Sequence, residues 1–215
     1  MTGNFANAQP RLGGLASMPG MTFQAASSAS TLYAMSDNPF DTAYSYTGIA
    51  GTTYSESNFR VRFATSNVVT SVARLLTGYG VPGQNRAIEF ESVVKPTQAQ
   101  NIGIRPSLTQ GTTGTGLTVG TNDVCYSSSL GIYVNGVQVS AAPPTWGGGD
   151  KIGIVYQPTV GTVVFYLNGA VVYTVSGISG DYTPACQSTG ATTGEIRVST
   201  SWSYGAIPGG GLYWR

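Results

Sequence analysis

The central part of the chain alternates between apolar residues and other residues with a period of two. Three short runs show this pattern, at residues 152–156, 163–167 and 171–175. Because successive side chains of a β-strand point to opposite faces, the period predicts three strands. Both alternating sets are mostly apolar, so we expect strands that are covered on both faces, as in a sandwich of two sheets.

The residues between these runs predict how the strands pair. Asn168-Gly169 separates the second and third runs, and a two-residue turn of this kind needs positive φ at both positions. The link between the first two runs contains Pro158 and Gly161, which predicts a slightly longer hairpin. The three strands should therefore form an antiparallel meander.

Strands are also expected before and after the meander, so the predicted fold class is all-β, a two-sheet antiparallel β-sandwich. They lie at residues 59–63, 68–76, 88–94, 101–105, 132–134, 137–139 and 196–200. Residues 68–76 also fit a short helix capped by Ser71, although we favour a strand. Asn135-Gly136 predicts a second tight hairpin.

Residues 1–50 differ from the rest of the chain and are interpreted as an N-terminal arm or linker, with the sandwich over residues 51–215. They are rich in Ala, Ser, Gly and Met and contain three helix- and strand-breaking prolines. Such a segment is either a flexible tail or an arm ordered by packing on neighbouring subunits or on a larger particle. The first residues have neither the charged start nor the apolar run of a signal peptide, so we expect none.

Three segments of the chain resemble the pattern of the SPRY (B30.2-type) family. They are GDKIGI at 149–154, GTVVFYLNG at 161–169 and YTPA at 182–185, which match G-D-x-I-G, G-T-x-x-F-x-x-N-G and Y-x-P-A. Upstream, IEFE at 88–91 and IGI at 102–104 resemble an earlier strand pair of that family. The resemblance implies a concanavalin-like jelly-roll sandwich used for recognition. Sandwiches of this kind also occur in bacteriophage virions as fibres, knobs or capsid decorations.

The charge of the chain argues against two classes of partner. The net charge is +1 and only 9% of the residues are charged, so there is no basic field for a nucleic-acid backbone and no polybasic membrane patch. No apolar run reaches the roughly 18 residues that a membrane-spanning helix needs. We therefore expect neither nucleic-acid binding nor membrane insertion.

The chain contains no histidine. This excludes Ser-His-Asp and Cys-His catalytic arrangements and histidine metal sites, and we expect no cofactor and no metal. Cys125 and Cys186 are the two cysteines. They could form a disulfide, but without a secretory signal we favour two small buried apolar residues.

One carboxylate pair could support catalysis. Glu89 and Glu91 alternate on one strand, about 7 Å apart at Cα. Their carboxyl groups could approach the roughly 5–5.5 Å of a retaining glycosidase. Alternatively, Arg60 and Arg62, which alternate in the same way, form structural ion pairs with these glutamates across the sheet. We favour the ion pairs and predict that the protein is not an enzyme.

Aromatic residues in or beside expected loops are candidates for ligand binding, since aromatic faces stack on sugar rings and anchor protein interfaces. These are Trp146, Tyr126, Tyr133, Trp202 and Tyr204. Trp146 is the first choice, because it lies in a loop rich in Pro and Gly before the meander.

These observations lead to one favoured function and two alternatives. We expect a non-enzymatic virion structural or adhesion protein, a fibre, knob or capsid decoration, that is assembled in the host cytoplasm and recognises protein or glycan. Its partners would be other virion proteins, itself in a homo-oligomer such as a trimer, and a host-surface glycan. The alternatives are a stand-alone carbohydrate- or protein-binding module and a jelly-roll glycoside hydrolase that uses Glu89 and Glu91.

Overall fold

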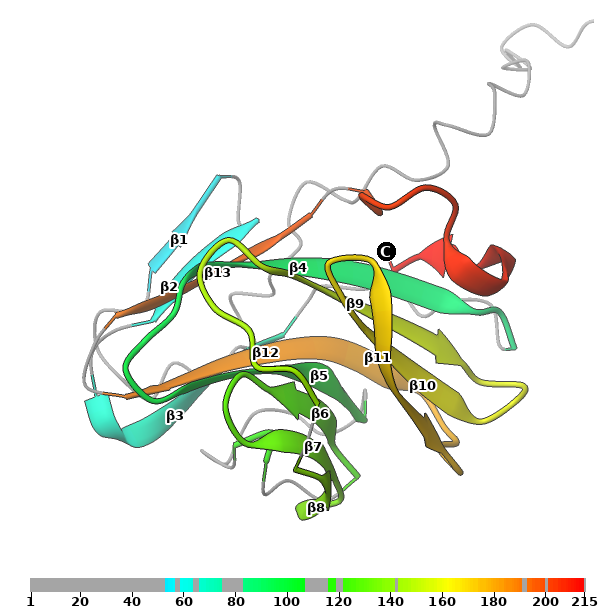
Figure 1. The fold of residues 1–215 in the computed structure, drawn as a ribbon, viewed down its shortest axis with the longest axis horizontal. Helices are drawn as coiled ribbons and strands as arrows, with labels where there is room; N and C mark the ends of the chain where they lie inside the picture. Colours follow the sequence, from blue (N-terminus) through cyan, green and yellow to red (C-terminus); the bar gives the residue numbers. More distant parts are fainter. Residues whose placement is uncertain are drawn as a thin grey trace, which may run out of the picture.

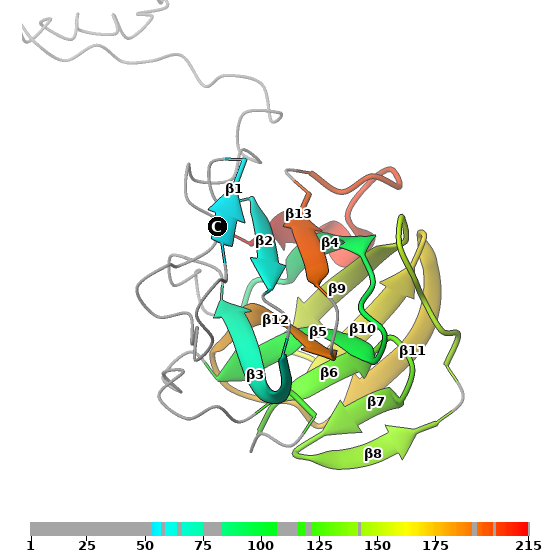
Figure 2. The ribbon, with the colours of Figure 1, turned by 90° about the vertical axis from the view of Figure 1, so that its left-hand side faces the viewer.

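The fold is a sandwich of two β-sheets that face each other (Figures 1 and 2). The computed structural model describes residues 53–56, 59–63, 66–74, 83–106, 116–118, 122–141, 143–190, 193–199 and 201–214. The expected arm at residues 1–50 lies outside these ranges. Among the described residues no helix is long and apolar enough to cross a membrane.

The larger sheet has eight strands, in the order β1-β2-β13-β4-β9-β10-β11, with β14 also paired to β4. Their bounds are β1 Thr53–Ser55, β2 Arg60–Phe63, β4 Arg86–Val94, β9 Lys151–Gln157, β10 Thr162–Leu167, β11 Ala170–Ser176, β13 Gly194–Val198 and β14 Leu212–Tyr213. All pairings are antiparallel except that of β14 with β4, which is parallel.

The smaller sheet has six strands, in the order β3-β12-β5-β6-β7-β8. Their bounds are β3 Ser66–Arg74, β5 Ala99–Pro106, β6 Val124–Ser127, β7 Gly131–Val134, β8 Val137–Ser140 and β12 Tyr182–Gly190. One short 3₁₀ helix, η2 at Pro208–Gly210, precedes β14. The predicted all-β sandwich is confirmed, and so is the strand interpretation of residues 68–76 as far as Arg74, where the described residues end.

Both Asn-Gly pairs form the tight hairpins that the sequence predicts. Asn168 and Gly169 have φ of 49° and 85° between β10 and β11. Asn135 and Gly136 have φ of 53° and 77° between β7 and β8. Asparagine and glycine tolerate this left-handed region better than other residues, which is why these pairs fix where the strands turn.

The residues that resemble the SPRY pattern hold two loops together. Gly147 N and Asn168 Nδ2 each donate to the Asp150 carboxylate at 2.8 Å. The backbone N–H of Lys151 donates to Asn168 Oδ1 at 2.9 Å. Asp150 and Asn168 therefore tie the start of β9 to the β10–β11 turn, and their role is structural.

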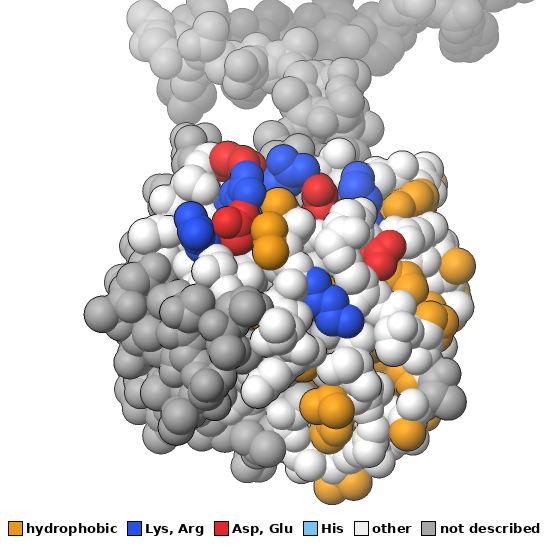
Figure 3. Space-filling view, turned by 60° about the vertical axis from the view of Figure 1, so that its left-hand side comes forward, with side chains coloured by type: hydrophobic (Ala, Val, Ile, Leu, Met, Phe, Trp, Pro, Cys, Tyr) orange, Lys and Arg blue, Asp and Glu red, His pale blue; other side chains and the backbone are white. Residues whose placement is uncertain are grey.

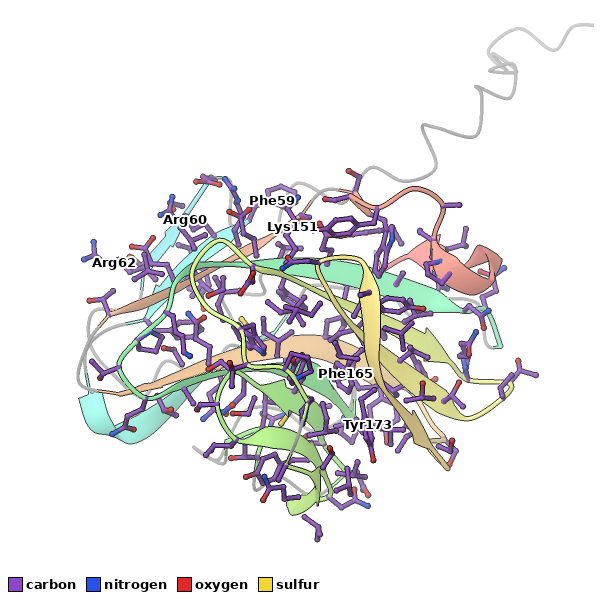
Figure 4. The ribbon with its side chains drawn as sticks, in the orientation of Figure 1. Phe59, Arg60, Arg62, Lys151, Phe165 and Tyr173 are labelled. Atoms are coloured by element: carbon purple, nitrogen blue, oxygen red, sulfur yellow. The ribbon has the colours of Figure 1, made fainter. Side chains whose placement is uncertain are left out.

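The core lies between the sheets and is formed by the inward-facing set of each strand. Phe165, labelled in Figure 4, lies at its centre and is fully buried. Cys186 belongs to this core, whereas Cys125 packs with Leu117 and Ala185 in a separate cluster. Both thiols are free and buried, and burial raises the pKa of each. The favoured interpretation of the cysteines is confirmed.

The outer face of the larger sheet is covered in part by the chain after β13. Trp202 and Ile207 pack on an apolar cluster of Ala87, Val155 and Tyr166. This cover explains why β9 is buried on both faces, as its two apolar sets predict. It also places polar and aromatic side chains side by side on one surface.

Candidate binding site

Two adjoining pockets lie on the outer face of the larger sheet, and we call them the charged pocket and the apolar pocket. The charged pocket, of about 400 Å³, is lined by Glu56, Phe59, Glu91, Lys151, Arg197, Val198, Ser199, Ser201 and Ser203. The apolar pocket, of about 410 Å³, is lined by Ser201, Trp202, Gly205, Ala206, Ile207, Gly210, Gly211 and Tyr213. Because Ser201 lines both, the two pockets adjoin and together make one candidate site.

Three neighbouring strands place the ionic residues of the charged pocket in one row. Arg197 of β13 is directly opposite Glu91 of β4, and Glu91 is directly opposite Lys151 of β9. Residues in register across adjacent strands point to the same face. The row therefore projects from the outer face, where basic and acidic side chains interleave (Figure 3).

The central ion pair of this row is well formed. Arg197 Nη2 and Nε donate to Glu91 Oε2 at 2.6 and 3.2 Å. Arg197 Nη1 also lies 3.7 Å from Oε2 of Glu56, the residue that follows β1. The hydrogen bonds from Arg197 to Glu91 raise the pKa of the guanidinium.

The predicted partners of Arg60 and Arg62 are wrong, although both arginines do form ion pairs. Arg60 donates to Glu195 and to Glu56, the latter at 3.1 Å, and Arg62 Nε lies 3.6 Å from Glu195. The reason is the strand order, because β13 lies between β2 and β4 and supplies Glu195. Neither arginine reaches β4, from which Glu89 and Glu91 project.

Glu89 is enclosed by the segment after β13. Ser203 Oγ and N donate to its carboxylate at 2.5 and 3.2 Å, and Lys151 Nζ lies 3.6 Å away. The Glu89 side chain is only 1% exposed and does not line either pocket. Glu91 lines the charged pocket, so the two carboxylates of the expected pair have different environments.

Two of the predicted binding aromatics are core residues, so a binding role is wrong for Trp146 and Tyr126. Their relative exposures are 2% and 0%, and their rings pack edge to face at 6.0 Å between centroids. The Tyr126 hydroxyl donates to the carbonyl of Pro144. Tyr133 packs on the cluster around Cys125 in the smaller sheet, away from both pockets.

The other two predicted aromatics lie at or near the site. Trp202 lines the apolar pocket and packs edge to face on Tyr166, with 5.3 Å between ring centroids. It lies directly over Gly153, where an added Cβ would come within 2.4 Å of its ring. Tyr204 is 43% exposed and lies beside the Asn168-Gly169 turn, outside both pockets.

Most of the residues that line the charged pocket carry no local signal of a binding role. Phe59 and Lys151 lie together on the outer side of the larger sheet, as Figure 4 shows. They come from opposite halves of the described chain, so only the strand order brings them together. In the part of the chain that the structure describes, no group of three or more His, Cys, Asp or Glu could hold a metal ion.

Comparison with solved structures supports the fold. The SPRY domain of human HERC1 superposes with a TM-score of 0.59 at 14% identity, over 74% of this chain and 96% of that domain. A second human SPRY domain gives 0.56 at 15% identity, over 71% and 96%. Stonustoxin gives 0.52 at 14% identity, over 74% of this chain and 26% of that protein.

No protein-family model and no curated protein sequence matches the chain. At the identities above, structural likeness establishes the fold and not the activity. The expected SPRY-like sandwich is therefore confirmed as an architecture.

Proposed function

We propose that the protein is a non-enzymatic recognition domain that binds its partner at the charged and apolar pockets. The observation that carries this proposal is that the two pockets adjoin at Ser201. Together they offer paired charges, hydroxyl groups and an aromatic wall on one surface. Convergent polar groups beside an apolar wall are typical of ligand sites.

The environment of the two glutamates supports a binding role over hydrolysis. A retaining glycosidase needs both carboxylates in contact with the sugar. Glu89 is covered by Ser203, and Glu91 is held by two hydrogen bonds from Arg197. Neither carboxylate is arranged to exchange a proton with a substrate, so we propose that neither is catalytic.

We propose further that the domain works as a structural or adhesion component of a virion. The sparse charge of the chain and the apolar content of its first fifty residues support assembly on a larger particle. In this setting the outer-face site would contact a host-surface ligand or a neighbouring virion protein. The alternative, a stand-alone binding module, would use the same site without a particle.

Two measurements on the intact chain test this proposal. An antibody against the purified protein should label particles of the virus that carries it in immunogold electron microscopy. Ser201→Trp fills the junction of the two pockets at an exposed position and should reduce attachment to host cells. Ser179→Trp, at an exposed position in the β11–β12 turn, is the matched control.

Unlabelled particles, together with a monomeric protein in light scattering, would contradict the virion role and favour the stand-alone module. Equal attachment by Ser201→Trp and the control would contradict the assignment of the site. Release of sugar from glycans by the purified chain, lost in Glu89→Gln, would contradict the absence of catalysis.

A further inference from the structure

The ionic side chains around the charged pocket balance one another. Four basic residues contact four acidic ones, and these are Arg60, Arg62, Lys151, Arg197, Glu56, Glu89, Glu91 and Glu195. Four positive and four negative charges sum to zero. A ligand that carries a charge would therefore compete with a partner already in place and gain no net attraction. The pocket favours a neutral ligand.

The same ion pairs hold hydrogen-bonding groups in fixed positions at the pocket. Lys151 has three N–H donors, and two of its neighbours are Ser203 Oγ at 2.6 Å and Glu89 at 3.6 Å. Glu91 uses Oε2 for both bonds from Arg197. A carboxylate has about four acceptor sites, so capacity remains on Glu91. The side chains of Lys151 and Glu91 are 32% and 20% exposed.

Serine hydroxyls complete this set of donors and acceptors. Ser199, Ser201 and Ser203 line the charged pocket in alternate positions of one segment. A serine hydroxyl can donate one hydrogen bond and accept two. Ser203 already donates to Glu89 and accepts from Lys151, so it keeps one acceptor site. A ligand rich in hydroxyl groups, each of which also donates and accepts, matches this lining better than a purely cationic or purely anionic group.

An aromatic side chain lies beside the polar groups. Phe59 lines the charged pocket next to Lys151 (Figure 4), and Trp202 lines the apolar pocket beyond Ser201. The C–H face of a sugar ring is apolar and stacks on such aromatic rings, whereas its hydroxyl edge needs polar partners. Each pocket, of about 400 and 410 Å³, lies within the usual range for small-molecule sites.

From this arrangement we propose that the site binds a neutral oligosaccharide. One sugar ring occupies the charged pocket, stacked on Phe59 and hydrogen-bonded by Glu91, Lys151 and Arg197. The next ring extends past Ser201 toward Trp202. This inference rests on the proposed recognition function and specifies the class of its ligand.

The test is isothermal titration calorimetry of the intact chain with a fixed panel of glycans. The panel contains neutral oligomers of glucose, galactose, mannose and N-acetylglucosamine, sialylated oligosaccharides and heparin fragments. We expect at least one neutral oligomer to bind, with an affinity that changes less than about twofold when salt is raised from about 0.1 to 1 M, since neutral ligands are not screened. Charged members should bind no better than their neutral counterparts.

Variants locate the site on the chain. Glu91→Gln and Phe59→Ala should each weaken binding about tenfold, because each removes one direct contact. Arg62→Gln also removes one charge from the same network, but it lies outside the pocket and its side chain is 60% exposed. This control should retain its affinity within about twofold.

Three results would overturn the inference: no binding of any neutral oligomer on the panel, binding of the charged members alone, or equal loss in Arg62→Gln and Glu91→Gln. The proposed recognition function fails separately, by the particle and cell-attachment measurements. If Ser201→Trp reduces attachment while no neutral oligomer binds, the site stands and the glycan ligand is wrong.

Discussion

The hydroxyl of Tyr213 supplies hydrogen bonds to the larger sheet at the point on β4 between its pairing with β14 and its pairing with β13. The strand β13 pairs with the second half of β4, and β14 pairs with its first half. At the junction the backbone N–H of Glu89 donates to Tyr213 Oη at 2.9 Å, and Tyr213 donates to the carbonyl of Ser199 at 2.8 Å. One buried hydroxyl therefore joins β4 to the chain on either side of the binding site.

Tyr213→Phe removes both hydrogen bonds without removing the ring. A buried backbone group left without a partner costs about 1–3 kcal/mol, so two such groups should cost about 2–6 kcal/mol in total. This is a large share of the roughly 5–15 kcal/mol by which a domain is usually stable. The free energy of unfolding can be measured by urea titration with tryptophan fluorescence as the signal.

Tyr173→Phe is the matched control for this change. Its hydroxyl lies 3.5 Å from the carbonyl of Val139 at the exposed sheet edges, so its removal should cost less than about 0.5 kcal/mol. The side chain extends from β11, as Figure 4 shows. If Tyr213→Phe is no more destabilised than Tyr173→Phe, the hydroxyl does not join the strands and the reasoning is refuted.

Three further predictions concern buried groups. Burial raises the pKa of Tyr156 to about 12, so the folded protein keeps a hydroxyl proton that the unfolded chain loses near about pH 10. The free energy of unfolding should therefore fall by up to about 1.4 kcal/mol per pH unit between about pH 10 and 12, and less steeply in Tyr156→Phe. Urea titrations at each pH measure this free energy. Cys125 and Cys186 should not react with Ellman's reagent in the folded protein and should both react in denaturant; fast reaction of the native protein would contradict their burial. Asp123→Ala removes the carboxylate 2.6 Å from the buried Arg105 and should lower the free energy of unfolding by about 3–5 kcal/mol in the same titration. A loss below about 1 kcal/mol would contradict a buried ion pair between the two side chains.

The sequence predicts β9, β10 and β11 well because two local signals coincide in this part of the chain. The period of two marks β9, β10 and β11, and the turn at Asn168-Gly169 fixes where β10 ends and β11 begins. Both signals act within a few residues, so no knowledge of distant segments is needed.

The ion pairs could not be predicted, because they depend on strand order. The two arginines alternate on β2 and the two glutamates alternate on β4, as expected. However, β13 lies between these two strands. A strand near the end of the chain thus supplies Arg197 and Glu195 to partners far away in sequence. No local pattern reports this insertion.

Trp146 shows the limit of arguing from loop composition. Its neighbours are prolines and glycines, which are typical of an exposed loop. The loop instead returns to the sheet, where the backbone N–H of Trp146 donates to the Ser128 carbonyl at 3.4 Å and the ring packs on Tyr126. Burial of this side chain depends on the tertiary fold, which the local sequence does not encode.

The most direct test of recognition at the outer face is an NMR titration of the ¹⁵N-labelled intact chain with the neutral members of the glycan panel. We expect shifts confined to the amides of residues 56, 59, 91, 151, 197–199 and 201–207, with no new reducing ends in the glycan spectrum. Shifts centred on the β8 and β11 edges, or the appearance of cleaved sugar, would contradict recognition without catalysis at this site.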